Sequence, residues 1–462
     1  MELTTNEETG WEMNNEIKLP MPVQFILNRL YENGYEGYIV GGCVRDCIMN
    51  NKPHDWDICT SALPEQIIEV FKDCKVLPTG IQHGTVSIVF DDSLKPYNIF
   101  EVTTYRVDGE YKDNRHPEKV EFVSNLRDDL ARRDFTINAM AYNEKQGLID
   151  LFGGVRDIKN KVIRCVGNPT ERFNEDALRI MRALRFSICL GFEIDEATLN
   201  AANDNLNLIK NISIERICSE LTKVFHRHMF DVFPNDNMKS RMKILDPIYM
   251  FLLNVIEAVL PDGMYSASGY TLKRLWYANS PHLEVNLAII FDVPNYIDIL
   301  KYLRFSNEII NTINDMYIYG HKIADDYPDW TDIKNRRADV YYARKLIHDI
   351  THCPSFLVND FAKSIIIVDR DKDYHNPNYF DQDVYSVCLT MLDLTISNCR
   401  KNQDVYDLKY MAINGNDLKE LGYKGREIGM ILSGLLDLVM QDKVKNNKDD
   451  LIIAIPQVMT DE

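Results

Sequence analysis

Two acidic side chains stand on either side of one tryptophan in the stretch Asp55-Trp56-Asp57. In a strand, residues two apart project from the same face, so we expect Asp55 and Asp57 to point together while Trp56 packs inside. Two converging carboxylates repel each other unless a cation lies between them, and proteins bind Mg²⁺ through one or two carboxylates together with substrate phosphates. The spacing therefore favours a magnesium site for phosphoryl transfer. A solvated acidic turn is the alternative for such a pair taken alone.

A pair of glycines lies upstream of these aspartates, after the apolar run at 38–40 and before a predicted helix. The backbone of Gly41 and Gly42 can approach a phosphate closely, next to the positive end of that helix. Arg45, in the first turn of the helix, has the planar donor group that binds phosphate oxygens in pairs. A lone Gly-Gly usually marks only a tight turn, but its combination with Arg45 and the aspartate pair is more specific and predicts a nucleotide site.

A second candidate site lies in the arginine-rich run at 175–186. On a helix, Asp176 and Arg179 would share one face, and Arg182 and Arg185 would continue it. A carboxylate only accepts hydrogen bonds and a guanidinium only donates them. Cytosine and adenine each present an amino donor beside a ring-nitrogen acceptor, whereas guanine and uracil present a carbonyl acceptor beside a ring N–H donor. An Asp–Arg pair therefore matches C and A, and one such bidentate contact discriminates against the wrong base by ~1–3 kcal/mol. The alternative is an ordinary surface salt bridge.

The elements that must hold these residues fall into two parts. Between residues 21 and 152, runs rich in Val, Ile, Thr and aromatic residues alternate with amphipathic segments, which predicts strands and helices. From residue 153 onward, almost every segment has apolar residues at helical spacing. The polar stretch 104–120 is expected to be a loop, and loops of this length are usually functional or disordered. Residues 1–20 are expected to form a mobile tail.

The composition sets the class of protein. The 462 residues carry a formal net charge of −18, which argues against a uniformly basic nucleic-acid surface, so any phosphate site must be a local basic groove. The ten cysteines form no Cys-x-x-Cys pair, which is typical of a reducing compartment. We find no signal-like start and no apolar run of membrane-spanning length. These features predict a cytoplasmic protein without a membrane partner.

Seven stretches resemble one known family, and they occur in that family's order. The family is the class II (bacterial-type) tRNA nucleotidyltransferases, which comprise the CCA-adding enzymes and the bacterial poly(A) polymerases. The resemblance runs from about residue 22 to 450 and is loose between about 230 and 400. The stretches are GGCVRD (41–46), DWDI (55–58), RRDFTINAMA (132–141), DLFGGVRDI (150–158), EDALRIMRALRF (175–186), SIERICSE (213–220) and NGNDLKELGYKGREIG (414–429).

The resemblance implies a fold and a reaction. The fold class is α+β, with a polymerase-beta-like nucleotidyltransferase head of mixed sheet and helices at 21–152. An all-helical neck with a nucleotide-template helix follows at 153–270, and a helical body and tail that bind tRNA follow at 271–462. The implied reaction is the addition of C, C and A to the tRNA 3′ end from CTP and ATP, with Mg²⁺ as cofactor. The expected partner is therefore tRNA, and DNA is not expected to bind.

The resemblance also assigns roles to particular residues. Asp55 and Asp57 would be the catalytic magnesium ligands, with Glu101 as a possible third carboxylate. Asp176 and Arg179 would act as the protein template for the base. The other nucleotide-binding residues would be Gly42, Arg45, Arg133, Arg182 and Arg185.

Two further segments receive expectations of a different kind. Lys424 and Arg426, at a glycine-flanked helix start, are expected to contact RNA phosphates. The segment 213–220, with Ser213 as a helix cap, is expected to hold the neck helix in place rather than to touch substrate.

Three alternatives remain open. A poly(A) polymerase would share every head motif, although such enzymes commonly carry a basic C-terminal extension and this chain ends in acidic sequence. An enzyme that adds only C and C is a second alternative, disfavoured because the loop after residue 106 looks intact. The third is an HD-type metal phosphohydrolase, suggested by His348, Asp349 and His352. It lacks further metal ligands at convincing spacing.

Overall fold

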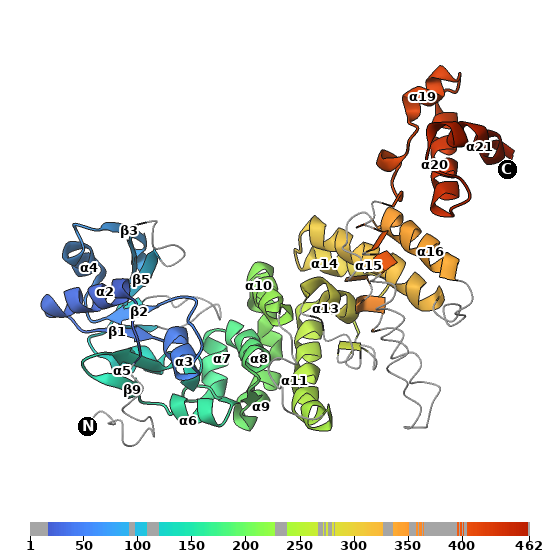
Figure 1. The fold of residues 1–462 in the computed structure, drawn as a ribbon. Coiled ribbons are helices and arrows are strands. Elements are labelled where there is room, and N and C mark those ends of the chain that lie inside the picture. The colour runs from blue at the N-terminus through green and yellow to red at the C-terminus, as the bar shows by residue number, and fades with distance from the viewer. Residues whose placement is uncertain are drawn as a thin grey trace. The chain divides into compact units, whose positions relative to one another are not determined.

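The computed structural model describes residues 17–91, 98–108, 120–226, 238–266, 282–326, 336–350 and 404–460, together with isolated positions between 271 and 280, 357 and 364, and 395 and 401. The chain forms two compact units. Unit 1 comprises Met1–Val224 with Met229–Gly263, and unit 2 comprises Phe225–His228 with Met264–Glu462 (Figure 1). The finer division at residues 20, 152 and 270 stays a prediction.

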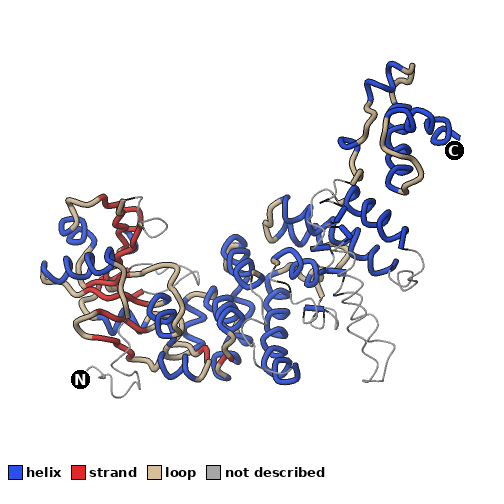
Figure 2. Tube along the Cα trace, in the orientation of Figure 1, coloured by secondary structure: helices blue, strands red, loops and turns tan. Residues whose placement is uncertain are grey.

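A seven-stranded mixed sheet with helices forms the first part of unit 1, which confirms the predicted fold class of the head (Figure 2). The strand order is β3-β4-β5-β2-β1-β8-β9. β2 and β5 pair in parallel, and the other neighbouring strands pair antiparallel. The strands are β1 (Gly37–Val40), β2 (Ile58–Thr60), β3 (Lys75–Gly80), β4 (Thr85–Val89), β5 (Ile99–Thr104), β8 (Met140–Asn143) and β9 (Gly147–Asp150).

Helices accompany this sheet so that β1, the neighbour of the central strand β2, is buried on both faces. Leu126 and Leu130 of α5 belong to one buried cluster with Tyr38 and Val40 of β1, which share a face because they are two apart. Ile39 points to the opposite face and is also fully buried. The helices of this part are α2 (Met21–Glu32), α3 (Gly42–Ile48), α4 (Pro64–Val70) and α5 (Leu126–Ala131).

The stretch 104–120, predicted to be a loop, is more ordered at its ends than expected. β6 (Arg106–Asp108) and β7 (Val120–Phe122) pair antiparallel there. The prediction of a loop was wrong for these two flanking segments, because the extended backbone after β5 forms hydrogen bonds with the backbone of β7. Residues 109–119 lie outside the described residues.

The second part of unit 1 is helical, as predicted, apart from a two-residue parallel pairing of β10 (Val162–Ile163) with β11 (Glu193–Ile194). α8 buries one apolar side, including Ile180, Met181 and Leu184, and it ends at Gly191 in the left-handed conformation that closes many helices (φ 68°). The helices here are α6 (Gly154–Lys159), α7 (Pro169–Glu175), α8 (Leu178–Leu190), α9 (Glu196–Asp204), α10 (Ile214–Phe225) and α11 (Met238–Val259).

Helices and short 3₁₀ turns are the only regular elements among the described residues of unit 2. Its last three helices enclose an apolar cluster that includes Leu418, Ile431, Leu435 and Leu451. None of the described helices combines the length and the apolar content that a membrane crossing requires. The helices are α13 (Leu283–Ile290), α14 (Tyr296–Tyr302), α15 (Asn307–Asp326), α16 (Arg336–Asp349), α19 (Gly415–Glu420), α20 (Arg426–Met440) and α21 (Lys448–Thr460). Short 3₁₀ turns lie at Ile81–His83, Thr136–Asn138, Leu206–Asn211 and Leu408–Tyr410.

Candidate active site

The register of the two central strands brings the glycine turn beside the aspartate pair. β1 and β2 run antiparallel with Ile39 opposite Ile58, and the Val40 N–H donates a 3.0 Å hydrogen bond to the Asp57 carbonyl. The end of β1 therefore meets the start of β2, with Val40 opposite Asp57, and the glycine turn at 41–42 follows directly after Val40. β2 begins only at Ile58, so the prediction that the aspartates lie within the strand was wrong: they immediately precede it.

Gly41, rather than Gly42, is the position at which only glycine fits. Its φ of 82° and ψ of −127° lie where L-residues are strained, and a Cβ there would lie 3.0 Å from Arg133 Nη1. A Cβ on Gly42 would meet its nearest atom, Arg45 Nη2, at 3.7 Å, which is an ordinary contact. Gly41 thus lets the chain turn from β1 into α3 while Arg133 lies against the turn.

The two glycines therefore give a matched pair of variants. We expect Gly41→Ala to lower the free energy of unfolding by about 1–3 kcal/mol, because alanine must adopt a strained backbone and displace Arg133. We expect Gly42→Ala to be neutral or stabilising, because glycine is less favourable than alanine in a helix. Urea unfolding of both variants measures this difference, and equal stabilities would contradict the assignment of strain to Gly41.

A positively charged cleft opens beside this turn within unit 1. Its volume is about 510 Å³, and it contains seven arginines against four aspartates, although the whole protein carries a net charge of −18. A local basic groove on an acidic protein is what phosphate binding requires. The cleft is lined by Gly41, Gly42, Arg45, Asp55, Asp57, Arg132, Arg133, Asp134, Asn138, Asp176, Leu178, Arg179, Arg182, Arg185, Phe186 and Arg216.

Asp55 and Asp57 both line this cleft and are open to solvent, while Trp56 between them is buried, as the alternation predicts. Desolvation by the surrounding protein raises the pKa of the Asp57 carboxyl, and the charges of Glu101 and Asp55 raise it further against the opposing effect of Arg133. A divalent cation would relieve this repulsion. Two carboxylates with open positions for substrate phosphates are a donor set that suits Mg²⁺.

Glu101 lies close to this pair but does not line the cleft. β2 and β5 pair in parallel with Ile58 beside Val102, so Asp57 and Glu101 occupy the preceding positions of neighbouring strands. Among the residues that the structure describes, no group of three or more His, Cys, Asp or Glu side chains is placed to hold a metal ion. The role of Glu101 as a third metal-binding carboxylate therefore stays a proposal.

A fully buried carboxylate, Asp129 on α5, positions two of the cleft arginines. Its Oδ1 accepts a hydrogen bond of 2.7 Å from Arg132 Nη2, and its Oδ2 accepts one of 3.2 Å from Arg133 Nη2. Burial alone would raise the pKa of Asp129, but the charges of Arg133 and Arg132 and their hydrogen bonds hold it below its usual value. The Arg132 Nε also donates to the Arg106 carbonyl at 3.1 Å, which ties this cluster to β6.

The remaining residue of the Arg132-Arg133-Asp134 run anchors an arginine of α8. Asp134 Oδ2 accepts a hydrogen bond of 2.6 Å from Arg182 Nε, and its Oδ1 accepts bonds from Phe135 N and Asn138 Nδ2. Burial opposes ionisation of this carboxyl, but the charge of Arg182 and these hydrogen bonds outweigh it, so the pKa of Asp134 is lowered. The run thus works as a structural network rather than as a surface ion-pair series.

This lowered pKa predicts a pH-dependent stability. A carboxyl whose pKa is lower in the folded than in the unfolded state contributes stability above its unfolded pKa of about 3.9, and this contribution is lost as the pH falls through the folded value. We therefore expect Asp134→Asn to cost about 3 kcal/mol at pH 7, where it leaves Arg182 unpaired. The difference from wild type should shrink below about pH 4. Urea unfolding across pH measures it, with exposed Asp73→Asn as control; a gap that stays constant to pH 2 would contradict the prediction.

Asp176 and Arg179 do not share a helix face as predicted. α7 ends at Glu175, and Asp176 adopts extended backbone (φ −137°, ψ 104°) before α8 begins at Leu178. Asp176 Oδ1 accepts a 3.0 Å hydrogen bond from the Leu178 N–H. The prediction was wrong because an aspartate that bonds a backbone N–H two residues on competes with helix continuation, and the periodicity of the sequence does not reveal this.

Both residues nevertheless line the cleft, and Arg179 joins several segments there. Its guanidinium donates hydrogen bonds to the carbonyl groups of Arg172 at 3.1 Å and Arg132 at 2.9 Å, and to Glu175 at 2.6 Å. The arginine expected to read the base is thus bonded directly to the backbone of the segment that carries Arg133.

The segment 213–220 contributes a residue that the sequence analysis did not assign to the site. Arg216 lines the cleft, and its Nη2 donates a 3.3 Å hydrogen bond to Asp176 Oδ2. Glu220, four residues later and hence on the same face of α10, lies 2.6 Å from Arg185 Nε. The spacing of Arg216 and Glu220 on one helix face was the available signal for this second set of contacts.

Arg45 is nearly buried and is held in a fixed orientation. Its Nε and Nη2 donate hydrogen bonds of 2.9 and 2.7 Å to Asp46 Oδ1, and its Nη1 donates one of 2.8 Å to Asn138 Oδ1. α3 and the segment that follows Asp134 therefore fix this arginine from two sides, at the edge of the glycine turn.

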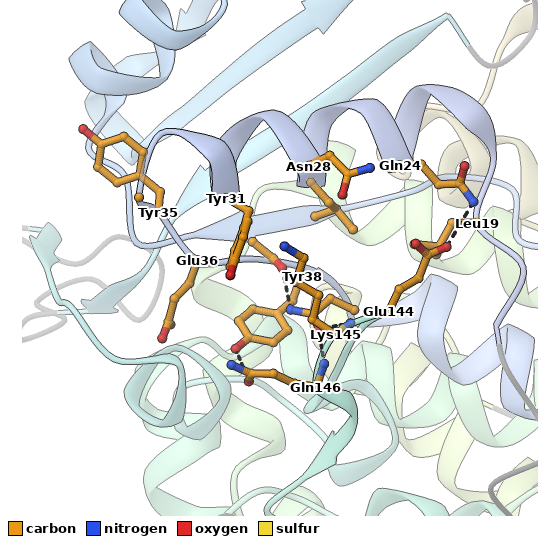
Figure 3. Close-up of a pocket in the computed structure, with 14 residues that line it drawn as sticks. Leu19, Gln24, Asn28, Tyr31, Tyr35, Glu36, Tyr38, Glu144, Lys145 and Gln146 are labelled. Carbon is orange, nitrogen blue, oxygen red and sulfur yellow. Dashed lines mark hydrogen bonds between the residues drawn. The ribbon is translucent and has the colours of Figure 1, made fainter.

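A second cavity of about 530 Å³ lies at the opposite end of β1, lined by Gly37 and Tyr38 rather than by the residues after Val40 (Figure 3). Polar side chains in its lining form hydrogen bonds with one another. Gln24 Nε2 donates to Glu144 Oε1 at 3.0 Å, and the Tyr38 hydroxyl donates to Gln146 Oε1 at 2.5 Å. No arginine and no aspartate belong to its described lining. Its size equals that of the basic cleft, but its chemistry does not suit phosphoryl transfer.

The other sequence candidates lie in unit 2. Lys424 and Arg426 are exposed on either side of Gly425, which caps α20. His348 and Asp349 end α16, and the Asp349 carbonyl accepts a hydrogen bond from Tyr319. His352 lies outside the described residues.

Two family models match parts of the chain. A family model described as "Poly A polymerase head domain" matches residues 37–164, and one described as "Probable RNA and SrmB- binding site of polymerase A" matches residues 191–229. Among solved structures, the CCA-adding enzyme of Bacillus stearothermophilus in complex with CTP is 25% identical, with a TM-score of 0.63 over 95% of this chain and 98% of that one. The fold of the Thermotoga maritima CCA-adding enzyme, solved with tRNA, is also similar (19% identity, TM-score 0.64, 99% and 100% coverage).

Curated relatives extend the match over the whole chain. The CCA-adding enzyme of Ligilactobacillus salivarius is 48% identical over 440 residues, covering 95% of this chain and 96% of that enzyme. The CCA-adding enzyme of Pediococcus pentosaceus is 31% identical over 461 residues, covering 96% and 100%. The match to the enzyme of Oceanobacillus iheyensis is 53% identical over 200 residues and spans 48% of that enzyme. The basic cleft beside an aspartate pair and this full-length similarity together show that the chain belongs to the CCA-adding enzyme family.

Proposed function

We propose that the protein is a CCA tRNA nucleotidyltransferase, which adds C, C and A in turn to the 3′ end of tRNA from CTP and ATP and releases pyrophosphate. The observation that carries the proposal is the basic cleft in which Asp55 and Asp57 lie beside the Gly41–Gly42 turn. The full-length similarity to CCA-adding enzymes supports it. A cytoplasmic location, where tRNA and nucleotides occur, follows from this activity.

In the proposed reaction, the tRNA 3′-hydroxyl oxygen attacks the α-phosphorus of the bound nucleotide. The hydroxyl releases its proton to solvent, a bond forms between its oxygen and the α-phosphorus, the bond from the α-phosphorus to the bridging oxygen breaks, and pyrophosphate leaves. Asp55 and Asp57 would hold Mg²⁺, which supplies Lewis-acid stabilisation of the reacting oxygens. Arg133 and Arg45, at the glycine turn, would bind the triphosphate and stabilise the charge that develops on the leaving group.

Base selection is assigned to Asp176 and Arg179. The Asp176 carboxylate would accept a hydrogen bond from the amino group of cytosine or adenine, and Arg179 would donate to the neighbouring ring nitrogen. Arg182 and Arg185 would contact the nucleotide and fix this pair. Arg216, which bonds Asp176, joins them as a residue that orients the carboxylate.

The alternatives differ in their support. The head motifs do not separate CCA addition from poly(A) polymerase activity, but the relatives that match over the whole chain are CCA-adding enzymes. In the loop after residue 106, which is expected to permit A addition, residues 109–119 lie outside the described residues. The HD-type phosphohydrolase is disfavoured because the relatives that match over nearly the whole chain are CCA-adding enzymes.

The experiment that tests the proposal is extension of a tRNA that ends at its discriminator base, with CTP, ATP and Mg²⁺, followed by sequencing of the product. We expect C-C-A and then a halt, with loss of extension in EDTA and recovery with excess Mg²⁺. A homopolymeric A tract would instead identify a poly(A) polymerase, a C-C product would identify a partial enzyme, and no extension would refute the proposal.

A further inference from the structure

One aromatic ring lies at the centre of the arginines in the cleft. The guanidinium carbon of Arg185 lies 4.1 Å from the centroid of the Phe186 ring, and those of Arg45 and Arg182 each lie 5.2 Å from it. Phe186 is only 5% exposed, lines the cleft, and meets Phe135 edge-on at 5.8 Å with an interplanar angle of 82°. The ring is thus fixed by packing and is surrounded by three positive charges.

The three guanidinium groups carry like charges and repel one another, and contact with the ring offsets part of this repulsion. Each of these arginines forms an ion pair with an acidic side chain: Arg45 with Asp46, Arg182 with Asp134 and Arg185 with Glu220. Further carboxylates would neutralise the cleft and occupy the N–H donors that a triphosphate needs. The face of an aromatic ring carries partial negative charge and attracts a guanidinium within about 6 Å without taking up its hydrogen bonds or its charge.

The ring also joins two parts of the site that are far apart in the sequence. Arg45 belongs to α3, next to the glycine turn, whereas Arg182 and Arg185 belong to α8, the helix that also carries Arg179. Contact with a common ring fixes the distance between the arginine expected at the triphosphate and the helix expected at the base. The correct spacing of these two contacts determines how well one nucleotide can satisfy both.

We propose that Phe186 is a positioning residue that holds Arg45, Arg182 and Arg185 together as a preorganised, still fully charged binding surface for the nucleoside triphosphate. This inference rests on the proposed function, because it takes CTP and ATP as the ligands. Phe186 itself touches no reacting atom and acts through the three arginines.

The test compares Phe186→Leu, Phe186→Tyr and the matched control Phe173→Leu. Phe173 is fully buried on α7, and no cation among the described residues lies over its ring. We expect Phe186→Leu to raise the KM for CTP and ATP, and the Kd for CTP measured by calorimetry without tRNA, by about 5- to 20-fold. We expect kcat to change less than about twofold, and Phe186→Tyr, which keeps the ring face, to remain near wild type.

Phenylalanines with one to three ring fluorines at position 186 separate the ring's charge from its shape. Fluorine weakens the negative face while nearly preserving the packing, so KM should rise stepwise with each fluorine. A KM that is independent of fluorination, or equal in Phe186→Leu and Phe173→Leu, would overturn the proposal and leave only a packing role. Wild-type enzyme runs in every assay, so failure of the wild type to add C-C-A refutes the proposed function and not this inference alone.

Discussion

Asp57→Asn is expected to lower kcat for nucleotide addition by at least about a thousandfold while leaving tRNA affinity within about twofold. Asparagine is nearly isosteric, but it removes one of the two negative charges that would hold Mg²⁺ in the cleft. A thousandfold loss in kcat corresponds to about 4 kcal/mol less metal-dependent stabilisation of the transition state, since each 1.36 kcal/mol changes the rate tenfold. Asp55→Ala should behave in the same way.

Single-turnover extension of tRNA and a filter-binding measurement of tRNA affinity check this result together. Asp73→Asn, an exposed head carboxylate on α4's flank that pairs with Arg29, is the control and should keep full activity. Glu101→Gln in the same assay tests the proposed third carboxylate, for which we expect a comparable loss. Near-normal extension by Asp57→Asn would remove the basis of the active-site assignment.

Asp176→Ala is expected to weaken selection for C and A rather than to abolish addition. One bidentate base contact is worth ~1–3 kcal/mol, so kcat/KM for CTP and ATP should fall by about 5- to 150-fold relative to UTP and GTP. Asp176→Asn should favour UTP over CTP more than Asp176→Ala does, because its amide N–H₂ can donate to a base carbonyl. Competition assays with all four nucleotides measure these ratios.

The chain offers a close control in Asp195. Like Asp176, it accepts a hydrogen bond from a backbone N–H near a helix start, here Thr198 N, and it pairs with an arginine, Arg164. Its side chain is 17% exposed and that of Asp176 is 20% exposed. Asp195→Ala should cost about 1 kcal/mol of stability, as loss of a cap does, without changing nucleotide preference. If Asp195→Ala relaxed selection as much as Asp176→Ala, the effect would be one of general destabilisation and not of base reading.

The spacing of side chains in the sequence predicted several of the residues that line the cleft. Their positions relative to one another depend on how the strands pair, which the sequence does not reveal. The exposure of Asp55 and Asp57 around buried Trp56 follows from alternation along extended chain, which is local. That Asp57 lies beside Gly41 depends on the antiparallel register of β1 and β2, and local sequence does not specify register.

The partners of Arg182 and Arg185 were harder to predict because they come from distant segments. Asp129, Asp134 and Glu220 are nearly or fully buried, yet in the sequence they look like ordinary solvent-exposed acids. Asp134 and Glu220 pair with Arg182 and Arg185 of α8 only in the folded chain, whereas Asp129 pairs with arginines three and four residues further along. Asp176 was misplaced for the opposite reason: a local hydrogen bond from its side chain interrupts a helix that periodicity alone would continue.

The cleft's positive side chains are all arginine, and no lysine occurs among the described residues that line it. A guanidinium keeps its proton at every pH at which the protein is folded, whereas an ammonium group in such crowded surroundings would lose it readily. The attraction for a triphosphate is therefore constant through the alkaline range and immune to lysine acetylation. A decline of activity at high pH would then not originate in discharge of these cleft arginines.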